Sequence, residues 1–140
     1  MKQAILDTDT LSYVIDGRYP EVTAQAKQYL RVFHYFSISV VSVCEIIEGR
    51  EAIQDYAGIA DFLKRVATFE IFSIDTDEAI TAGEILGALS RTGQKIGDLD
   101  PFIAAVAIVN QLPLITNNQR HYQRIIDLGF ALTLDNWKQS

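Results

Sequence analysis

Short apolar runs alternate along this chain with longer segments in which apolar residues recur at helical spacing. The short runs predict strands at residues 3–6, 36–41, 70–74, 113–116 and 130–134. The longer segments predict helices at about 8–16, 21–36, 42–49, 51–68, 78–91, 101–111 and 119–127. Because strands that alternate with helices are typical of α/β proteins, we expect a mainly parallel central sheet of about five short strands.

Residues that cap helices stand at several of the predicted helix starts. Thr8, Asp9 or Thr10 can cap the first helix, and Ser42 can cap the helix at 42–49. The stretch 75–77, Asp-Thr-Asp, can cap the helix at 78–91. These caps support the predicted order of elements along the chain.

The segment after Asp100 is apolar almost all round. Its large side chains, with alanines between them, are Phe102, Ile103, Val106, Ile108 and Val109. A helix without a polar face is a buried helix. Asp100 followed by Pro101 predicts the helix start, with Asp as the N-cap and Pro at the first helical position. Asp100 is therefore either an ordinary cap or a carboxylate that points into a cleft at the end of this helix.

Composition narrows the class of protein. The 140 residues, 49% hydrophobic and 21% charged, predict one globular domain over 1–140. The net charge of −6 argues against a general nucleic-acid binder, which would usually be basic. It leaves open an enzyme that gathers carboxylates around a metal ion. Basic residues that could form a local positive rim are Arg50, Lys64, Arg65, Arg91, Lys95, Arg120 and Arg124.

The single cysteine and the absence of long apolar runs bear on the cellular compartment. Cys44 has no partner for an internal disulfide or a cysteine-based metal site. No apolar run approaches the roughly 20 residues that a membrane span needs, and the apolar part of the N-terminus is too short for a signal peptide. We expect a cytoplasmic protein.

Polar residues follow or precede the predicted strands at places where a parallel sheet would bring them together. Asp7 follows the first strand, Glu45 lies one turn into the helix after the second, and Asp100 starts the helix before the fourth. Asn118 follows that fourth strand. Sites in such sheets form outside the carboxyl ends of the strands, near a switch in strand order. These four residues are our candidates for one catalytic site.

Each candidate also has a structural interpretation. Asp7 or Asp9 can cap the first helix, and Ser42 with Glu45 fits a capping box in which the glutamate reaches back to the cap. Asn118 can be an ordinary turn residue or cap. The functional interpretation depends on the four residues meeting in space.

Several carboxylates in one pocket cannot all remain ionised without a counter-charge. Either one takes up a proton, or a cation neutralises them. Oxygen ligands suit Mg²⁺, with Mn²⁺ as a possible substitute. Such an ion turns a bound water into a better nucleophile and stabilises charge on a phosphoryl oxygen. The cluster therefore predicts hydrolysis of a phosphodiester, and a histidine base is not required.

Four segments, in this order and spacing, resemble the PIN-domain family and in particular the VapC-type ribonuclease toxins of type II toxin–antitoxin pairs. They are Ile5-Leu6-Asp7-Thr8-Asp9, Ser42-Val43-Cys44-Glu45-Ile46-Ile47-Glu48-Gly49, residues 93–105 (GQKIGDLDPFIAA) and residues 114–122 (LITNNQRHY). The resemblance covers nearly the whole chain, and it implies a PIN-like three-layer α/β/α fold.

The resemblance implies an Mg²⁺-dependent endoribonuclease. By position, Asp7 and Asp100 would be the main metal ligands, Glu45 would complete the acidic cluster and help to orient the water, and Asn118 would be the fourth site residue. Many relatives have an acidic residue at the place of Asn118 or His121, and this chain has neither. That departure argues against a second metal site. Around these residues, Thr8, Asp9 and Asp98 would support the cluster, although Asp98 can equally be a turn residue.

The resemblance also implies partners. These are an RNA substrate, for which transfer RNA is one possibility, and a small VapB-like antitoxin. The tail of such an antitoxin blocks the acidic site, often with an arginine, which the carboxylates would attract. Family members commonly form homodimers, and no membrane partner is expected.

Two other functions are compatible with the residues. Asp7-Thr8-Asp9-Thr10 fits the DxDxT motif of haloacid-dehalogenase-like phosphatases, and residues 97–100 look like their late acidic motif. Asp7 would then be a covalent nucleophile and Asp9 a general acid, which leaves Glu45 without a role. The other alternative is a non-catalytic PIN-like module that binds protein or RNA.

Overall fold

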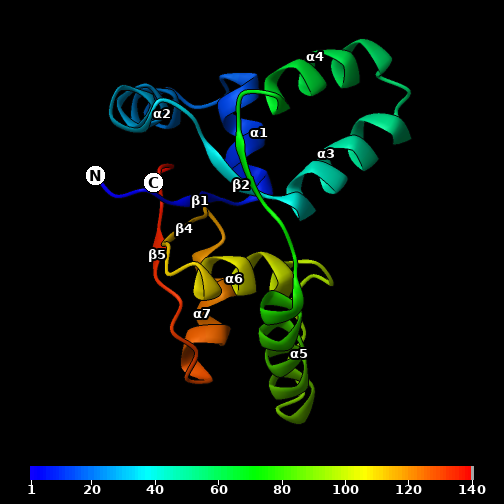
Figure 1. Ribbon diagram of the computed structural model, residues 1–140, viewed down its shortest axis with the longest axis vertical. Helices are drawn as coiled ribbons and strands as arrows, with labels where there is room; N and C mark the ends of the chain where they lie inside the picture. Colours follow the sequence, from blue (N-terminus) through cyan, green and yellow to red (C-terminus); the bar gives the residue numbers. More distant parts are fainter. Residues whose placement is uncertain (140) are drawn as a thin grey trace.

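Five parallel strands and seven helices make up the protein in the computed structural model, which describes residues 1–139 (Figure 1). The strands are β1 (Ile5–Leu6), β2 (Ser37–Ser39), β3 (Glu70–Phe72), β4 (Leu114–Ile115) and β5 (Leu134–Asp135). The helices are α1 (Thr8–Asp16), α2 (Pro20–Phe33), α3 (Val40–Ala52), α4 (Tyr56–Val66), α5 (Thr76–Arg91), α6 (Asp100–Val109) and α7 (Gln119–Asp127). None of the helices in this part of the chain is long and apolar enough to cross a membrane.

The strand order is β3-β2-β1-β4-β5, and every neighbouring pair is parallel. This confirms the predicted α/β class and the parallel sheet of about five short strands. The chain moves outward in one direction from β1 to β3 and then crosses to the other side of β1 to form β4 and β5. The switch in direction lies between β1 and β4, which is where sites form in sheets of this kind.

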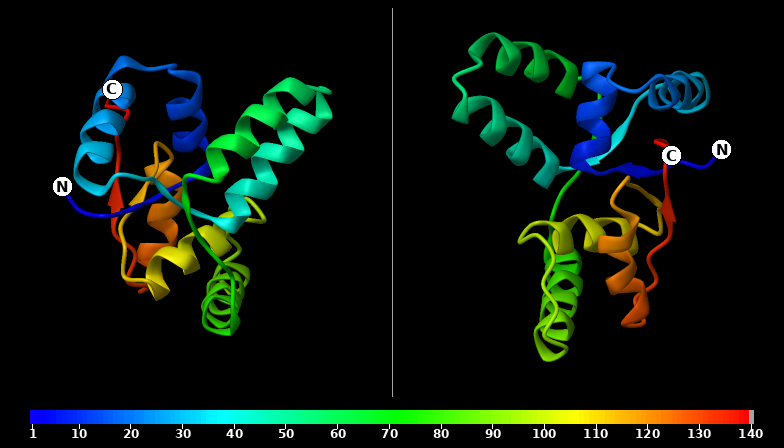
Figure 2. Two further views of the ribbon diagram at one scale, coloured as in Figure 1. Left: turned by 45° about the horizontal axis from the view of Figure 1, so that its top comes forward. Right: turned by 180° about the vertical axis from the view of Figure 1, so that it is seen from behind.

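Helices cover both faces of the sheet, as the three-layer fold requires. Ile5 and Leu114 point into an apolar cluster with α5, α6 and α7, whereas Leu6 and Ile115 point into a second cluster with α1, α2 and the inner residues of α3 and α4. Successive side chains of a strand face opposite sides, so two-residue strands are enough to join two cores. Figures 1 and 2 show α1–α4 on one side of the strands and α5–α7 on the other.

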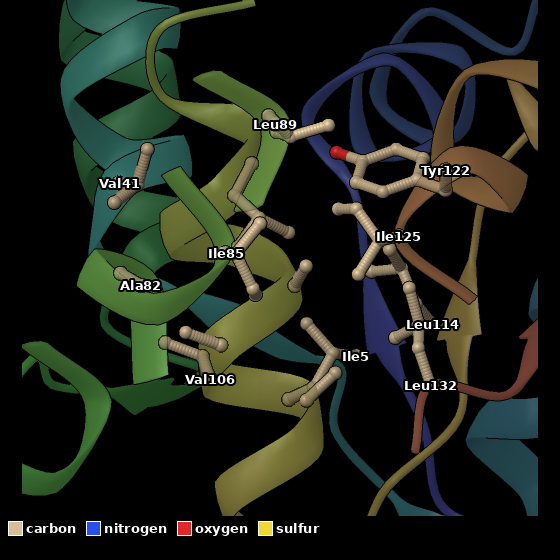
Figure 3. Packing of buried hydrophobic residues seen from close by; sticks show 14 residues of the cluster. Ile5, Val41, Ala82, Ile85, Leu89, Val106, Leu114, Tyr122, Ile125 and Leu132 are labelled. Carbon is tan, nitrogen blue, oxygen red and sulfur yellow. The ribbon is translucent and has the colours of Figure 1, made fainter. Parts of the chain in front are cut away.

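The helix α6 is buried, as its sequence predicts. Residues 103–107 are at most 1% exposed, and Val106 and Ile103 pack among side chains of α5 and the sheet. Figure 3 shows Val106 beside Ile85 and Ala82 of α5, with Ile5 of β1 next to them. The alanines of α6 allow the neighbouring backbones to approach closely, so the start of this helix is held firmly at one end of the sheet.

Several predicted helix starts are wrong. The N-cap of α6 is Leu99, and Asp100 is the first residue of the helix. No side chain caps this helix, and its first backbone hydrogen bonds are accepted by the carbonyl of Leu99, at the end of the turn 97–99. The N-cap of α3 is Ser39, whose hydroxyl accepts from the Val41 N–H at 3.1 Å. Ser42 and Glu45 therefore form no capping box.

Other boundaries also differ from the prediction. The first helix is capped by Asp7, whose carboxylate accepts from the Thr10 N–H at 2.8 Å. This confirms the structural interpretation of Asp7, whereas the caps suggested at Thr8, Asp9 and Thr10 are wrong. Gly49 lies within α3, which continues to Ala52, so the next helix begins only at Tyr56. The helix α2 ends at Phe33, α5 begins at Thr76, and the last strand is confined to 134–135.

We predict that Tyr29→Phe destabilises the protein. The buried Tyr29 hydroxyl accepts from the Ala4 N–H at 3.1 Å and donates to the Ala4 carbonyl at 3.3 Å, which ties α2 to the start of β1. Removing the hydroxyl leaves both backbone groups unpaired, so the free energy of unfolding in urea should fall by about 1–3 kcal/mol. Tyr56→Phe is the matched control, because Tyr56 is 58% exposed and should change little. Equal stability of the two variants would contradict this role.

Candidate active site

A cavity of about 550 Å³ opens where the chain leaves β1 and β4 at their carboxyl ends. Its lining residues are Asp7, Thr8, Asp9, Glu45, Gly97, Asp98, Leu99, Asp100, Asn118 and Tyr122. The structure thus brings together all four predicted site residues, which come from the end of β1, from α3, and from the starts of α6 and α7. The cavity lies at the switch in strand order, between the two groups of helices.

Asp7 is the most buried carboxylate of the cavity, with 4% of its surface exposed. It accepts hydrogen bonds from the Thr10 N–H and from the Thr116 hydroxyl. Burial raises the pKa of Asp7 from 3.8 to about 6 although these hydrogen bonds, and the hydroxyl of Thr10, oppose the rise. A carboxylate held in this way favours a proton or a cation beside it.

The Glu45 carboxylate, on α3, is held by a hydrogen bond from α1. The Thr8 hydroxyl donates to Glu45 Oε1 at 2.6 Å and lies 2.9 Å from the hydroxyl of Ser42. Because a hydroxyl has one proton, Thr8 donates to Glu45 and accepts from Ser42. Partial burial raises the pKa of Glu45, and the nearby charge of Asp100 adds to that rise. The carboxylate lies in the second turn of α3, since this helix begins at Val40.

Asp100 is paired with a histidine that sequence reasoning did not place in the site. His121 Nε2 lies 2.8 Å from Asp100 Oδ2 and 3.1 Å from the backbone nitrogen of Gly97. The sequence offered one signal, because His121 lies one turn after Asn118 at the start of α7.

Tyr122 is a second cavity residue that the sequence does not indicate, because its place on α7 is typical of an ordinary buried apolar side chain. Its ring is 1% exposed and packs in the apolar cluster with residues of α5 and α7, as Figure 3 shows. Burial and the charges of Asp100 and Asp7 raise the pKa of Tyr122 well above its usual value. The residue therefore stays neutral and offers a hydroxyl donor to Asp100.

The remaining polar lining residues, Asp9, Asp98 and Asn118, are exposed. Asn118 is the N-cap of α7, yet its side chain makes no capping hydrogen bond, so its amide is not used as the cap that the structural interpretation suggested. Its backbone N–H donates to the Thr116 hydroxyl at 2.9 Å, which links α7 to Asp7. Asp9 and Asp98 are exposed and add negative charge to the mouth of the cavity.

Part of the predicted basic rim is paired elsewhere. Arg50 contacts Asp55 at 3.0 Å, and Arg65 contacts Asp61 at 3.0 Å. Arg124 donates to the backbone carbonyl of Lys95 at 2.9 Å. Among the described residues, no lysine or arginine lines the cavity. The negative potential of its carboxylates is therefore not neutralised by side chains of the lining.

Comparison with known proteins shows the family to which this chain belongs. Residues 4–126 match the family described as "PIN domain". The chain belongs to the PIN domain family. Within it, the chain is 33% identical to "Ribonuclease VapC2" of Haemophilus influenzae over 141 residues, which cover 98% of this chain and 99% of that relative. The VapC-type resemblance seen in the sequence is therefore confirmed.

Two further similarities extend this result. The PIN domain is 29% identical to "tRNA(fMet)-specific endonuclease VapC" of Salmonella typhimurium, over 89% of this chain and 93% of that relative. A solved structure titled "Crystal structure of DNA bound VapBC from Salmonella typhimurium" matches with a TM-score of 0.76 and 26% identity, over 99% of this chain and 100% of that chain. The parallel sheet and its helical layers are thus those of VapC structures.

The donor set of this PIN domain fits a hard divalent cation. Asp7, at the start of α1, and Asp100, at the start of α6, offer carboxylate oxygens to the cavity, and Asn118 adds an amide oxygen. Within residues 1–139, no group of three or more His, Cys, Asp or Glu side chains is placed so that it could hold one metal ion. Mg²⁺ does not require three, because it is usually bound through one or two carboxylates and keeps several waters.

We predict that Asp7→Asn stabilises the metal-free protein above neutral pH. A carboxyl whose pKa is raised by folding favours the folded state only when protonated, so its ionisation costs stability as the pH rises from 3.8 to about 6. The amide removes this cost and can still accept from the Thr10 N–H. The variant should therefore be more stable than the wild type by about 3 kcal/mol at about pH 8.

The two proteins should converge in stability only below the unfolded-state pKa of 3.8, at about pH 3, where the wild-type carboxyl is mostly protonated in both states. Urea unfolding at several pH values in the presence of EDTA measures this difference. Glu84→Gln, at an exposed position of α5, is the control and should show no such pH dependence. An Asp7→Asn variant that is less stable than the wild type at about pH 8 would contradict the argument.

Proposed function

We propose that this chain is a divalent-metal-dependent endoribonuclease and the toxin of a toxin–antitoxin pair. The observation that carries the proposal is the convergence of Asp7, Glu45 and Asp100 on one cavity at the switch in strand order. Membership of the VapC-type PIN domains supports the ribonuclease class.

Asp7 and Asp100 are the proposed metal ligands. The raised pKa of Asp7 supports this assignment, because a nearby cation offsets the cost of ionising a buried carboxyl. We propose Mg²⁺ as the ion, with Mn²⁺ as a possible substitute, since both suit oxygen ligands. When bound, the ion lowers the pKa of a coordinated water and stabilises negative charge on the phosphoryl oxygen.

Glu45 is proposed to orient the attacking water and to accept its proton. Its raised pKa makes it a better proton acceptor than an ordinary surface glutamate. The Thr8 hydroxyl fixes Oε1 and leaves the second carboxylate oxygen for the water. Asn118 is an exposed lining residue of the cavity, so its amide would be able to contact the substrate.

The proposed substrate is RNA, with transfer RNA as the first class to test. The support is the relative from Salmonella typhimurium that is named as a tRNA(fMet)-specific endonuclease. The proposed partner is a small VapB-like antitoxin, since a solved relative of similar fold is a VapBC complex. A cationic side chain of the antitoxin would fit the acidic cavity. The homodimer implied by the resemblance stays a prediction.

The two other functions are less well supported. The match to the PIN domain over residues 4–126 favours nuclease chemistry over a haloacid-dehalogenase-like phosphatase. In the phosphatase, Asp9→Asn would be as harmful as Asp7→Asn, whereas the nuclease proposal expects a milder loss for the exposed Asp9. A module that only binds would retain its cellular effect after Asp7→Ala and Asp100→Ala.

We predict that the purified protein cleaves RNA only with a divalent cation and with Asp100 intact. A labelled total RNA pool incubated with Mg²⁺ should give discrete fragments, and EDTA should abolish them. Asp100→Asn should lower the rate at least about 100-fold, the equivalent of about 2.7 kcal/mol of transition-state stabilisation. Sequencing of the fragment ends then identifies the RNA and the cleavage site.

Asp77→Asn is the matched control for this assay, because Asp77 is an exposed residue of α5 outside the cavity. It should leave the rate unchanged. Cleavage that continues in EDTA, or that survives Asp100→Asn, would overturn the proposed mechanism. Hydrolysis of a small phosphomonoester without RNA cleavage would instead support the phosphatase.

A further inference from the structure

Side chains on one face of α7 form hydrogen bonds with the segment that carries Asp100. His121 contacts both ends of this turn, with Nε2 at 3.1 Å from the Gly97 nitrogen and 2.8 Å from Asp100 Oδ2. One helical turn later, Arg124 donates to the Lys95 carbonyl at 2.9 Å. Residues three apart lie on the same face of a helix, so the two side chains act together on the segment 95–100.

The ring of His121 also contacts the aromatic ring of the next residue. It meets the buried Tyr122 ring edge to face, with centroids 5.7 Å apart and planes at 90°. The turn is tight, because a Cβ added at Gly97 would lie 3.1 Å from Asp100 Oδ2. On this side of the turn, the Asp100 carboxylate is therefore bounded by Gly97 and the His121 ring, and it remains open to the cavity.

A single ring nitrogen serves two different partners. Towards the Asp100 carboxylate Nε2 must donate, whereas towards the Gly97 N–H it must accept, and it can do only one of these at a time. When Asp100 turns towards a cation, the same nitrogen remains able to hold the turn through Gly97. The contact can thus persist whether or not Asp100 is engaged elsewhere.

We propose that His121 is a positioning residue, which clamps the Gly97–Asp100 turn to α7 and sets the orientation in which Asp100 meets the cation. The clamp follows from the contacts of this chain alone, whereas its effect on cation binding rests on the proposed function. Hydrogen-bond partners of metal-binding carboxylates commonly contribute about 10–100-fold to metal affinity or activity. His121 is absent from the four residues that the sequence assigned to the site.

The experiment compares His121→Ala with His121→Gln. The glutamine can replace both contacts, because its oxygen accepts from Gly97 and its NH₂ group donates to Asp100. Hydrogen exchange at the Gly97 amide in the metal-free protein measures the clamp. Calorimetric titration with Mn²⁺ measures the effect on the cation, and kcat and KM for RNA cleavage measure the effect on the reaction.

His121→Ala should accelerate exchange at Gly97 at least about tenfold and weaken Mn²⁺ binding by about 10–100-fold, with the loss of activity mainly in kcat. His121→Gln should stay within about threefold of the wild type in every measurement. The other histidine of the chain supplies the control. His34→Asn, at the exposed left-handed C-cap of α2, should change none of these values.

The outcomes separate this inference from the proposed function. If His121→Ala exchanges the Gly97 amide at the same rate as the wild type and binds Mn²⁺ with the same affinity, the inference is overturned, even if the wild type cleaves RNA. A wild type that neither binds Mn²⁺ nor cleaves RNA would defeat the proposed function, and exchange at Gly97 would still decide the clamp. If His121→Ala does not fold, His121→Asn replaces it, because its shorter amide cannot reach both partners. An asparagine variant that behaves like glutamine would then contradict the proposal.

Discussion

The two-residue strand β1 is the constraint on which the rest of the structure depends. Its backbone pairs in register with β2 on one side and β4 on the other, so both hydrogen-bonding edges are satisfied. Ile5 and Leu6 point to opposite faces and join the two apolar clusters. Because this strand is fixed on all sides, Asp7, the residue that follows it, cannot easily move out of its buried position.

The site is therefore built at a cost to stability. Asp7 is buried at the end of an apolar strand, where its pKa of about 6 shows that the charged form is disfavoured. Glu45, whose pKa is also raised, faces the same cavity. A fold optimised for stability alone would place neutral groups here, and strained or destabilised groups of this kind are common at functional sites.

The cavity joins two parts of the fold that have separate cores. Asp7 caps α1 and Glu45 lies in α3, whereas Asp100 begins α6 and His121 lies in α7. Figure 2 shows the two groups of helices, α1–α4 and α5–α7, on different sides of the strands. A cation held between Asp7 and Asp100 would link these sides. The clamp of His121 on the turn before α6 would limit the movement of one ligand relative to the other, which links the packing of α7 to chemistry in the cavity.

Local patterns in the sequence determined the alternation of strands and helices, the buried α6 and the placement of Asp7, Glu45, Asp100 and Asn118 at strand and helix ends. Only the tertiary structure decided what these side chains touch. Asp100 pairs with His121 across 21 residues of sequence, and Glu45 with Thr8 across 37. Spacing along one element cannot encode such contacts, because they depend on strand order and on where each helix begins.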